Sequence, residues 1–420
     1  MKSKIIRQPA DQESKIKNFL KSYIRRFGEA SPLGGLSPNT LLILIILIGS
    51  FLRLQGVFTN SFAFTYDVGR DMLALWNIVY EHKIPLIGPT TGIPGVFYGP
   101  WWYFILTPFF LLFQGNPQGI AFVMSAIGIL SIYLSYYVGK RIGNSFLGLS
   151  MALLASISPL MISLSSQIWN PNIAPLFVLL TMLVLERIYI LKNKARLRYF
   201  FILGILLALN IDIEILWGIF FSFGIFISLI VILRKKLAIK QIISTILGVL
   251  VILSPRIIFD FRHGFLISKS FLSFLTIKTL EDKLDLYHFL ENRVLIHLDE
   301  FSKSFMQGNN YLIIPLLLFI LISILLFYKK ASQITKNFIL TSFIVLLVFF
   351  VGTLIFSHAL WPHYLVGLPV IYIFLLSVSL FLFSKRLRSG LVGIIILIVL
   401  FIIKEQKIEG GIIIQTRAVK

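Results

Sequence analysis

Residues 40–57, "TLLILIILIGSFLRLQGV", form an apolar run that is long enough to cross a lipid bilayer as an α-helix. Similar runs recur along the 420-residue chain, which is 57% hydrophobic and only 14% charged. In a soluble domain about a quarter of the residues are charged. The runs lack the alternation of polar and apolar residues that marks the strands of an outer-membrane barrel. The chain is therefore predicted to be an all-α, polytopic membrane protein.

The remaining apolar runs set the expected number of membrane spans. They cover residues 119–138, 146–165, 173–191, 199–233, 241–259, 311–328, 337–356, 364–383 and 390–403. The run 199–233 is too long for one span and lies between two basic clusters, so we expect a hairpin of two helices with "NIDIEI" at its tip. Together with the first span, these runs predict about eleven transmembrane helices.

The formal net charge is +21, and the basic residues gather at the ends of the apolar runs. The clusters lie at residues 140–141, 192–198, 234–240, 329–336 and 385–388. Such clusters are typical of the cytoplasmic side of a membrane protein. Nucleic-acid binding is not expected, because no basic face is interleaved with aromatic residues. The chain has no cysteine, which excludes disulfides and thiol chemistry.

One apolar segment, "YGPWWYFILTPFFLLFQ" at residues 98–114, is just long enough to cross the membrane. If it crossed, every later basic cluster would lie outside, against the positive-inside rule. Its tryptophans and tyrosine are typical of the membrane interface, and prolines interrupt it. A juxtamembrane or re-entrant helix on the outer side is therefore predicted.

This topology divides the chain into three parts. Residues 1–39 are expected to form a cytoplasmic basic arm on anionic lipid, residues 40–404 the transmembrane domain, and residues 405–420 a C-terminal tail. The outer side then carries a long first loop at residues 58–118 and a large loop at residues 260–310. Most of the His, Asn, Asp and Glu residues lie in the outer segments, which makes that side the place to look for chemistry.

The first outer loop contains "FAFTYDVGRDM" at residues 62–72, where Asp67, Arg70 and Asp71 follow the first span closely. The overlapping stretch "GRDMLALWNIVYEH" has an amphipathic pattern and is expected to form a surface helix. Asp67 should then lie just before the helix, and Asp71 on or near its first turn. A purely structural interpretation stays open, in which these acids only cap the helix.

Several features, taken in order along the chain, resemble the GT-C superfamily of integral membrane glycosyltransferases. They are the first span, the Asp67-x-x-Arg70 motif, "PLIGP" at residues 85–89, the Gly-Pro-aromatic-aromatic segment at 99–102 and "NPN" at 170–172. The bacterial branch of protein O-mannosyltransferases and the lipid A aminoarabinose transferase is the most similar. The resemblance implies an inverting enzyme that moves a sugar from a polyprenyl-phosphate donor to a lipid, glycan or protein acceptor. It also implies a multi-pass protein of the cytoplasmic (inner) membrane, with its active site on the outer side.

The resemblance further implies roles for particular residues. In this family the first outer-loop acid is the catalytic base, which corresponds to Asp67, with Asp71 as a second catalytic candidate. Such a base takes the proton of the acceptor hydroxyl. The leaving phosphate needs fixed positive charge or hydrogen-bond donors. The candidates for this role on the outer side are Arg70, Arg262, His263, His363 and Tyr364. The residues expected near the acceptor, in the second outer loop, are Asn170 and Asn172.

Two departures from the family pattern concern metal binding. Val68 follows Asp67 where many relatives carry Glu, and Asn172 follows the second-loop proline where many carry an acid. Fewer acids converge, so no metal or other cofactor is expected. Asp71, Asp212 or Glu214 could restore a divalent-metal site, so this alternative stays open.

Two other functions compete with the transferase. A polysaccharide polymerase or ligase of the O-antigen type would place its Arg and His residues in the large late loop, with little demand on the first loop. Asp67 in a long first loop argues against it. A transporter or lipid-linked-sugar flippase needs ionisable groups inside the spans and usually repeated halves. The spans here are nearly free of charge, and the halves do not match.

The predicted topology can be tested by labelling single cysteines from outside, because the chain has no native cysteine. We expect residues 98–114 not to cross the membrane and residues 192–198 to lie in the cytoplasm. A cysteine beside Arg196 should therefore stay unlabelled in intact cells and react after the cells are permeabilised. Labelling of that cysteine in intact cells would show the assignment to be wrong.

Overall fold

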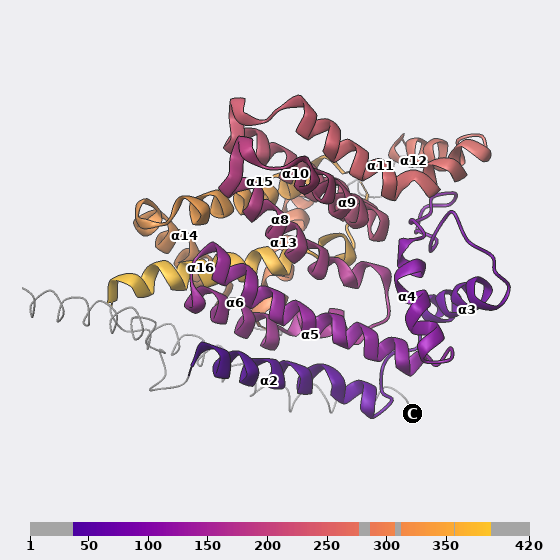
Figure 1. The fold of residues 1–420 in the computed structure, drawn as a ribbon, viewed down its shortest axis with the longest axis horizontal. Helices are drawn as coiled ribbons and strands as arrows, with labels where there is room; N and C mark the ends of the chain where they lie inside the picture. The colour runs from indigo at the N-terminus through magenta and orange to yellow at the C-terminus, as the bar shows by residue number, and fades with distance from the viewer. Residues whose placement is uncertain (1–36, 277–285, 307–311, 357, 388–420) are drawn as a thin grey trace, which may run out of the picture.

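The computed structural model describes residues 37–276, 286–306, 312–356 and 358–387. Within these ranges the chain is helical and forms no strand, apart from an isolated bridge between Thr90 and Phe97. The long helices lie side by side in a bundle (Figure 1). The predicted all-α membrane fold is therefore confirmed, whereas the expected arm at 1–39, the run at 390–403 and the tail at 405–420 lie wholly or almost wholly outside the described residues.

The α-helices follow one another with short connections. They are α2 (Pro38–Phe58), α3 (Tyr66–Tyr80), α4 (Trp101–Leu112), α5 (Pro117–Ile142), α6 (Ser145–Ile157), α7 (Pro159–Ser166), α8 (Ala174–Leu191), α9 (Leu197–Ile213), α10 (Ile215–Leu233), α11 (Ile239–Arg262), α12 (Leu266–Thr276), α13 (Leu286–Phe305), α14 (Ile313–Phe327), α15 (Gln333–Ile355) and α16 (Leu368–Leu387). Two 3₁₀ turns are important for the site, namely η1 (Asn170–Ile173) and η7 (Pro362–Leu365).

The described residues contain seven helices that are long and apolar enough to cross a membrane, or eight if α6 and α7 form one broken span. The predicted number of about eleven spans is therefore not confirmed. The hairpin expected within residues 199–233 is present as α9 and α10, which meet at Glu214. Helix α9 has 17 residues and is shorter than a usual span.

The run at residues 146–165, expected as one helix, is bent by 60° between α6 and α7. Ser158 caps α7 and Pro159 opens it, and a proline nitrogen cannot donate the hydrogen bond that a continuous helix requires. The break frees carbonyl groups at the end of α6. The buried Arg53 of α2 donates to two of them, those of Ala155 (2.8 Å) and Ser156 (2.9 Å).

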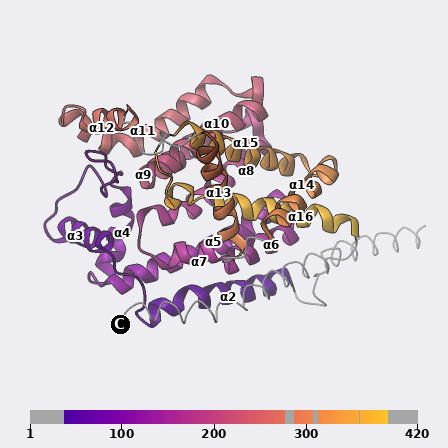
Figure 2. The same ribbon diagram turned by 180° about the vertical axis from the view of Figure 1, so that it is seen from behind.

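Helix ends beside four of the five basic clusters lie at the end of the bundle away from α3 (Figure 1). The hydroxyl of Thr335, at the start of α15, donates to the carbonyl oxygen of Ile142 at the end of α5 (2.9 Å). Near the start of α11, Gln241 donates to the carbonyl oxygen of Ala195 (3.4 Å), just before α9. Both contacts join helix ends next to basic clusters, whereas both views place α3, α4 and α12 at the opposite end (Figures 1 and 2).

Helix α4 forms within the segment whose membrane crossing was in question. Its 12 residues span only about 18 Å at the α-helical rise, well short of a hydrocarbon core of about 30 Å. It packs against α3 at the end of the bundle rather than running alongside the long helices (Figure 1). This placement agrees with a juxtamembrane helix.

The start of α4 is held by Asp212 near the end of α9. The backbone N–H of Gly99 donates to the Asp212 carbonyl oxygen (3.1 Å), and the N–H of Trp101 donates to the Asp212 carboxylate (3.2 Å). The Trp101 indole donates to the carbonyl oxygen of Ile252 in α11 (2.7 Å). A Cβ atom on Gly99 would lie only 1.5 Å from an Asp212 carboxylate oxygen, so this close approach requires glycine.

Replacing Gly99 with Ala should therefore weaken the docking of α4 onto α9. We expect a loss of about 1–3 kcal/mol in the free energy of unfolding, the usual cost of overpacking. The thermal unfolding midpoint of the detergent-solubilised protein measures this loss. Gly92→Ala is the matched control, because a Cβ on Gly92 would meet nothing within 4 Å. Equal midpoints for the two variants would contradict the packing described.

Candidate active site

A cavity of about 460 Å³ lies at the end of the bundle that carries α3. Its lining includes Asp67 and Arg70 of α3, Glu214 between α9 and α10, and His363 and Tyr364 of η7. The cavity thus brings three of the predicted phosphate ligands, Arg70, His363 and Tyr364, together with Asp67, the predicted base. Asp67 and Arg70 lie early in the sequence, whereas His363 and Tyr364 lie late in it.

Asp67 faces this cavity from the first turn of α3. The Thr65 side chain accepts the Val68 N–H (3.4 Å) and caps the helix, so α3 begins at Tyr66. The expectation that Asp67 precedes the helix is therefore corrected. The Asp67 side chain remains 41% exposed. Asp67 lies in the first turn of α3, a position that favours an acidic side chain because of the helix dipole.

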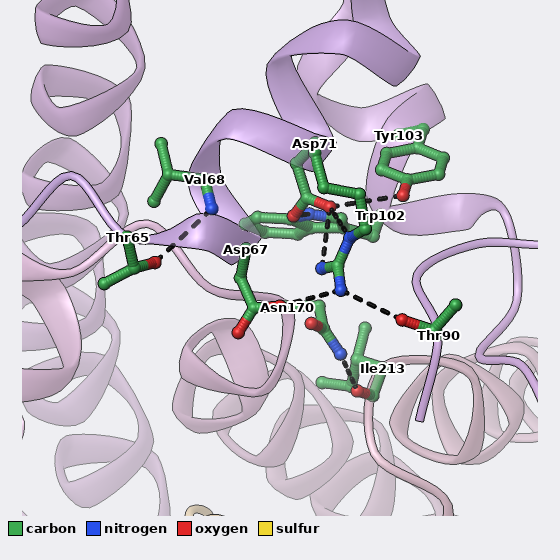
Figure 3. A network of polar contacts seen from close by, with 10 residues as sticks. Thr65, Asp67, Val68, Asp71, Thr90, Trp102, Tyr103, Asn170 and Ile213 are labelled. Atoms are coloured by element: carbon green, nitrogen blue, oxygen red, sulfur yellow. Dashed lines mark hydrogen bonds and ion pairs between the residues drawn. The ribbon is translucent and has the colours of Figure 1, made fainter. Parts of the chain in front are cut away.

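Asp71, one turn further along α3, is fully buried and does not line the cavity. Its carboxylate accepts hydrogen bonds from Arg70 (2.9 and 3.0 Å), from the Trp102 indole (2.8 Å) and from the Tyr103 hydroxyl (3.2 Å), as Figure 3 shows. Burial raises the pKa of Asp71, and these donors oppose the rise. Both oxygens are occupied, so Asp71 is suited to joining α3 to α4 rather than to proton transfer.

Arg70 lies between the two carboxylates. Its Nη1 donates to Asp67 (2.7 Å) and to the Thr90 hydroxyl (3.2 Å), while its other nitrogens contact Asp71 (Figure 3). Arg70 is the only arginine or lysine among the described residues that line the cavity. It thus places a fixed positive charge beside Asp67 and sets the direction of that carboxylate.

His363 and Tyr364 face Asp67 and Glu214 from the other side of the cavity. The His363 ring lies 5.0 Å from the ring of Trp169 and 4.4 Å from that of Tyr364. Burial lowers the pKa of His363 to about 4, although Asp67 opposes this effect. Burial also raises the pKa of Tyr364 to about 12. At neutral pH both side chains are therefore uncharged hydrogen-bonding groups.

Arg262 and His263 lie at the end of α11, where both are exposed and neither lines the cavity. The His263 ring stacks on Phe259 with 4.0 Å between ring centroids. The structure does not bring this pair together with Asp67, and their assignment to the donor phosphate stays a prediction.

The second-loop residues Asn170 and Asn172 are buried in η1 and do not line the cavity. Asn170 donates to the carbonyl oxygen of Ile213 (2.5 Å), at the end of α9 (Figure 3). Asn172 donates to the carbonyl oxygen of Gln167 (3.2 Å). Both amides support the backbone around the cavity, and their assignment to the acceptor stays a prediction.

Residues that the sequence did not assign to the transfer reaction complete the site, and Glu214 among them was named only as a possible metal ligand. Glu214 and Tyr98 line the cavity together, and Arg256 lines an adjacent apolar cavity of about 260 Å³. The two cavities share Ile215 and Phe271, so they are neighbours. The two acids in "NIDIEI" at residues 210–215 were the sequence feature that could have pointed to Glu214 as a site residue. No sequence pattern distinguished Arg256 from the exposed Arg262 two turns later.

The described residues contain no group of three or more His, Asp or Glu side chains arranged to hold a metal ion. Asp71 and Asp212 are each engaged with helix α4, and Glu214 contacts Tyr98 instead of another acid. The independence of the reaction from metal stays a prediction.

The different environments of Asp67 and Asp71 predict different effects on stability. Asp71→Asn removes the buried partner of Arg70 and should lower the free energy of unfolding by about 3 kcal/mol. Asp67→Asn weakens a partly exposed pair and should cost less than about 1 kcal/mol. Thermal unfolding of the two purified variants measures the difference. Similar losses for both would contradict the structural role of Asp71.

The comparisons with known proteins agree with this arrangement. Residues 98–259 match the family model described as dolichyl-phosphate-mannose-protein mannosyltransferase. The fold is similar to that of ArnT from Cupriavidus metallidurans, solved with undecaprenyl phosphate bound, with 14% identity and a TM-score of 0.53. That match covers 86% of this chain and 62% of ArnT, so the chain spans less than two thirds of the ArnT length.

A second solved structure is less similar. The oligosaccharyltransferase of Archaeoglobus fulgidus matches with 16% identity and a TM-score of 0.44, over 85% of this chain and 52% of that one. A search of curated protein sequences finds no match. The family-model match and the ArnT-like fold confirm the resemblance drawn from the sequence, which is to the GT-C superfamily of membrane glycosyltransferases.

Proposed function

We propose that this chain is an inverting glycosyltransferase, which transfers a sugar from a polyprenyl-phosphate donor to the hydroxyl group of a lipid, glycan or protein acceptor. The observation that carries the proposal is the placement of the Asp67 side chain at the cavity. Its carboxylate faces a cavity, is partly exposed and is oriented by Arg70. By contrast, both carboxylate oxygens of the neighbouring Asp71 already accept hydrogen bonds. A general base needs an accessible carboxylate within reach of the proton it removes.

The transfer uses these groups in one displacement. The acceptor hydroxyl gives its proton to Asp67, and its oxygen forms a bond to the anomeric carbon of the sugar. The bond from that carbon to the phosphate oxygen breaks, and the polyprenyl phosphate leaves with the electron pair. Attack from the side opposite the leaving group inverts the anomeric carbon. Arg70 provides positive charge in the cavity where negative charge moves during this step.

The adjacent apolar cavity suits the lipid part of such a donor. Its lining is mostly aliphatic or aromatic, with Arg256, Asp260 and Ser268 as the polar exceptions. Because it shares Ile215 and Phe271 with the site cavity, a prenyl chain there would leave its phosphate near the boundary. Arg256 is a candidate phosphate ligand at that boundary, alongside Arg70. The undecaprenyl phosphate bound to ArnT supports a donor of this class.

The distribution of charge supports an active site on the outer side of the cytoplasmic membrane. Helix ends next to basic clusters lie at the end of the bundle opposite α3, and the positive-inside rule places such clusters in the cytoplasm. The cavity then opens on the outer side, where a lipid-linked sugar can meet an exported acceptor.

Asp67→Asn keeps the shape of the side chain but cannot accept the proton. We expect turnover to fall by ~100-fold or more, the usual scale for a general base, while the folded protein still binds donor. Mass spectrometry of envelope glycolipids and glycoproteins, in a deletion strain complemented with each variant, identifies the product and measures its loss. Glu81→Gln is the matched control, because Glu81 is an exposed acid at the end of α3 outside the cavity. Near-normal product with Asp67→Asn would remove Asp67 from the mechanism.

A further inference from the structure

Glu214 is a buried acid of the cavity that the proposed displacement does not use. It is only 2% exposed and lies in the break between α9 and α10. The Tyr98 hydroxyl donates a hydrogen bond of 2.7 Å to its carboxyl group. Both residues line the same cavity as Asp67. A buried carboxyl group at a substrate cavity costs free energy, so it calls for a functional explanation.

The pair is held rigidly from both sides. Tyr98 exchanges backbone hydrogen bonds with residues 88 and 89 (2.9 Å each), and the next residue, Gly99, donates to Asp212 of α9. Glu214 is fixed because its own carbonyl oxygen and N–H group bond to Gly218 (2.9 Å) and Asn210 (3.2 Å). The two side chains therefore meet in a preformed position instead of depending on a mobile loop.

Among the described residues that line the cavity, no cation pairs with Glu214. Tyr98 and Tyr364 face it from the first loop and from η7. Of the other polar cavity residues, Arg70 is engaged with Asp67 and Asp71, and His363 is neutral at physiological pH. Burial raises the pKa of Glu214 to about 8, against the opposing effect of Tyr98 and of nearby backbone N–H groups. Glu214 is therefore mainly a neutral acid at pH 7.

We propose that Glu214 and Tyr98 form a subsite that binds a hydroxyl group of the donor sugar, with the protonated Glu214 as hydrogen-bond donor. A carboxylic acid can donate and accept, whereas a carboxylate only accepts. The acceptor capacity of Glu214 is largely used by Tyr98 and by the N–H groups of Ile215 and Leu216, so its proton is left for the substrate. This inference rests on the proposed transferase function.

The subsite makes the affinity for the sugar fall as the pH rises. A bound sugar removes water from the cavity and so disfavours the ionised form of Glu214 further. Binding is therefore tightest below a pH of about 8, where Glu214 holds its proton, and weakens as the pH rises through that value. Loss of one such hydrogen bond corresponds to ~10-fold in affinity.

The test measures binding to the full-length protein in detergent, with two probes of equal charge. Farnesyl-phosphate mannose carries a sugar, and farnesyl methyl phosphate is the same phosphodiester without it. We expect the wild type to bind the sugar probe more tightly at about pH 7 and to lose ~10-fold of that preference at about pH 9. Glu214→Gln should keep the preference at both values, because its amide still donates and does not titrate.

Two further variants make the result specific. Tyr98→Phe removes a hydrogen bond that lowers the pKa of Glu214, so the loss of sugar preference should begin at a higher pH than in the wild type. This shift in the pH dependence tests the subsite even if the Glu214→Gln protein does not fold. Glu81→Gln, an exposed acid outside the cavity, should behave like the wild type.

The remaining outcomes separate the subsite from the function on which it rests. Equal binding of the two probes, a preference that does not change with pH, or an unshifted profile in Tyr98→Phe would overturn the subsite alone. Loss of the preference in a folded Glu214→Gln protein at neutral pH would show that the carboxylate, not the acid, is needed. Failure of both probes to bind would overturn the lipid-phosphate donor and the subsite with it.

Discussion

The buried carboxylate of Asp71 is the contact on which the geometry of the site depends. It accepts hydrogen bonds from Arg70, Trp102 and Tyr103, and so joins the surface helix α3 to the short helix α4. A buried ion pair stabilises a structure only when further hydrogen bonds offset the loss of water. Here the indole and phenol donors meet that condition. The same Arg70 then reaches Asp67, so the catalytic candidate is oriented by its buried neighbour.

A second acid extends this connection into the membrane bundle. Asp212 of α9 binds the backbone at the start of α4, and α4 carries the aromatic donors that hold Asp71. The first loop is thus fixed to the long helices through successive carboxylate contacts. These acids differ little as residue types, yet their surroundings give them separate tasks. Asp71 and Asp212 are occupied by helix α4, while Asp67 and Glu214 face the cavity.

Much of the fold could be predicted from the sequence, because the apolar runs and the basic clusters between them follow directly from the physics of a bilayer. Asp67, Arg70, His363 and Tyr364, which the sequence singled out, line one cavity, because loops on one side of a membrane can converge. Their roles in catalysis stay predictions. The burial of Asp71 could not be read from the chain, since its aromatic donors, Trp102 and Tyr103, lie some thirty residues later in α4. The exposure of Arg262 likewise depends on where α11 ends, and the sequence places that end only to within a few residues.

The interrupted helices explain why chemistry is possible at this end of the bundle. A continuous helix satisfies all its backbone groups and offers lipid an apolar surface, whereas a break exposes polar groups that hydrocarbon cannot satisfy. The break between α9 and α10 lies at the cavity and brings Glu214 to it, and η1 supports that junction through Asn170. The break between α6 and α7 is buried, and the Arg53 guanidinium donates to the carbonyl groups freed there. Both helix breaks thus lie where a cavity or a buried side chain meets the freed polar groups.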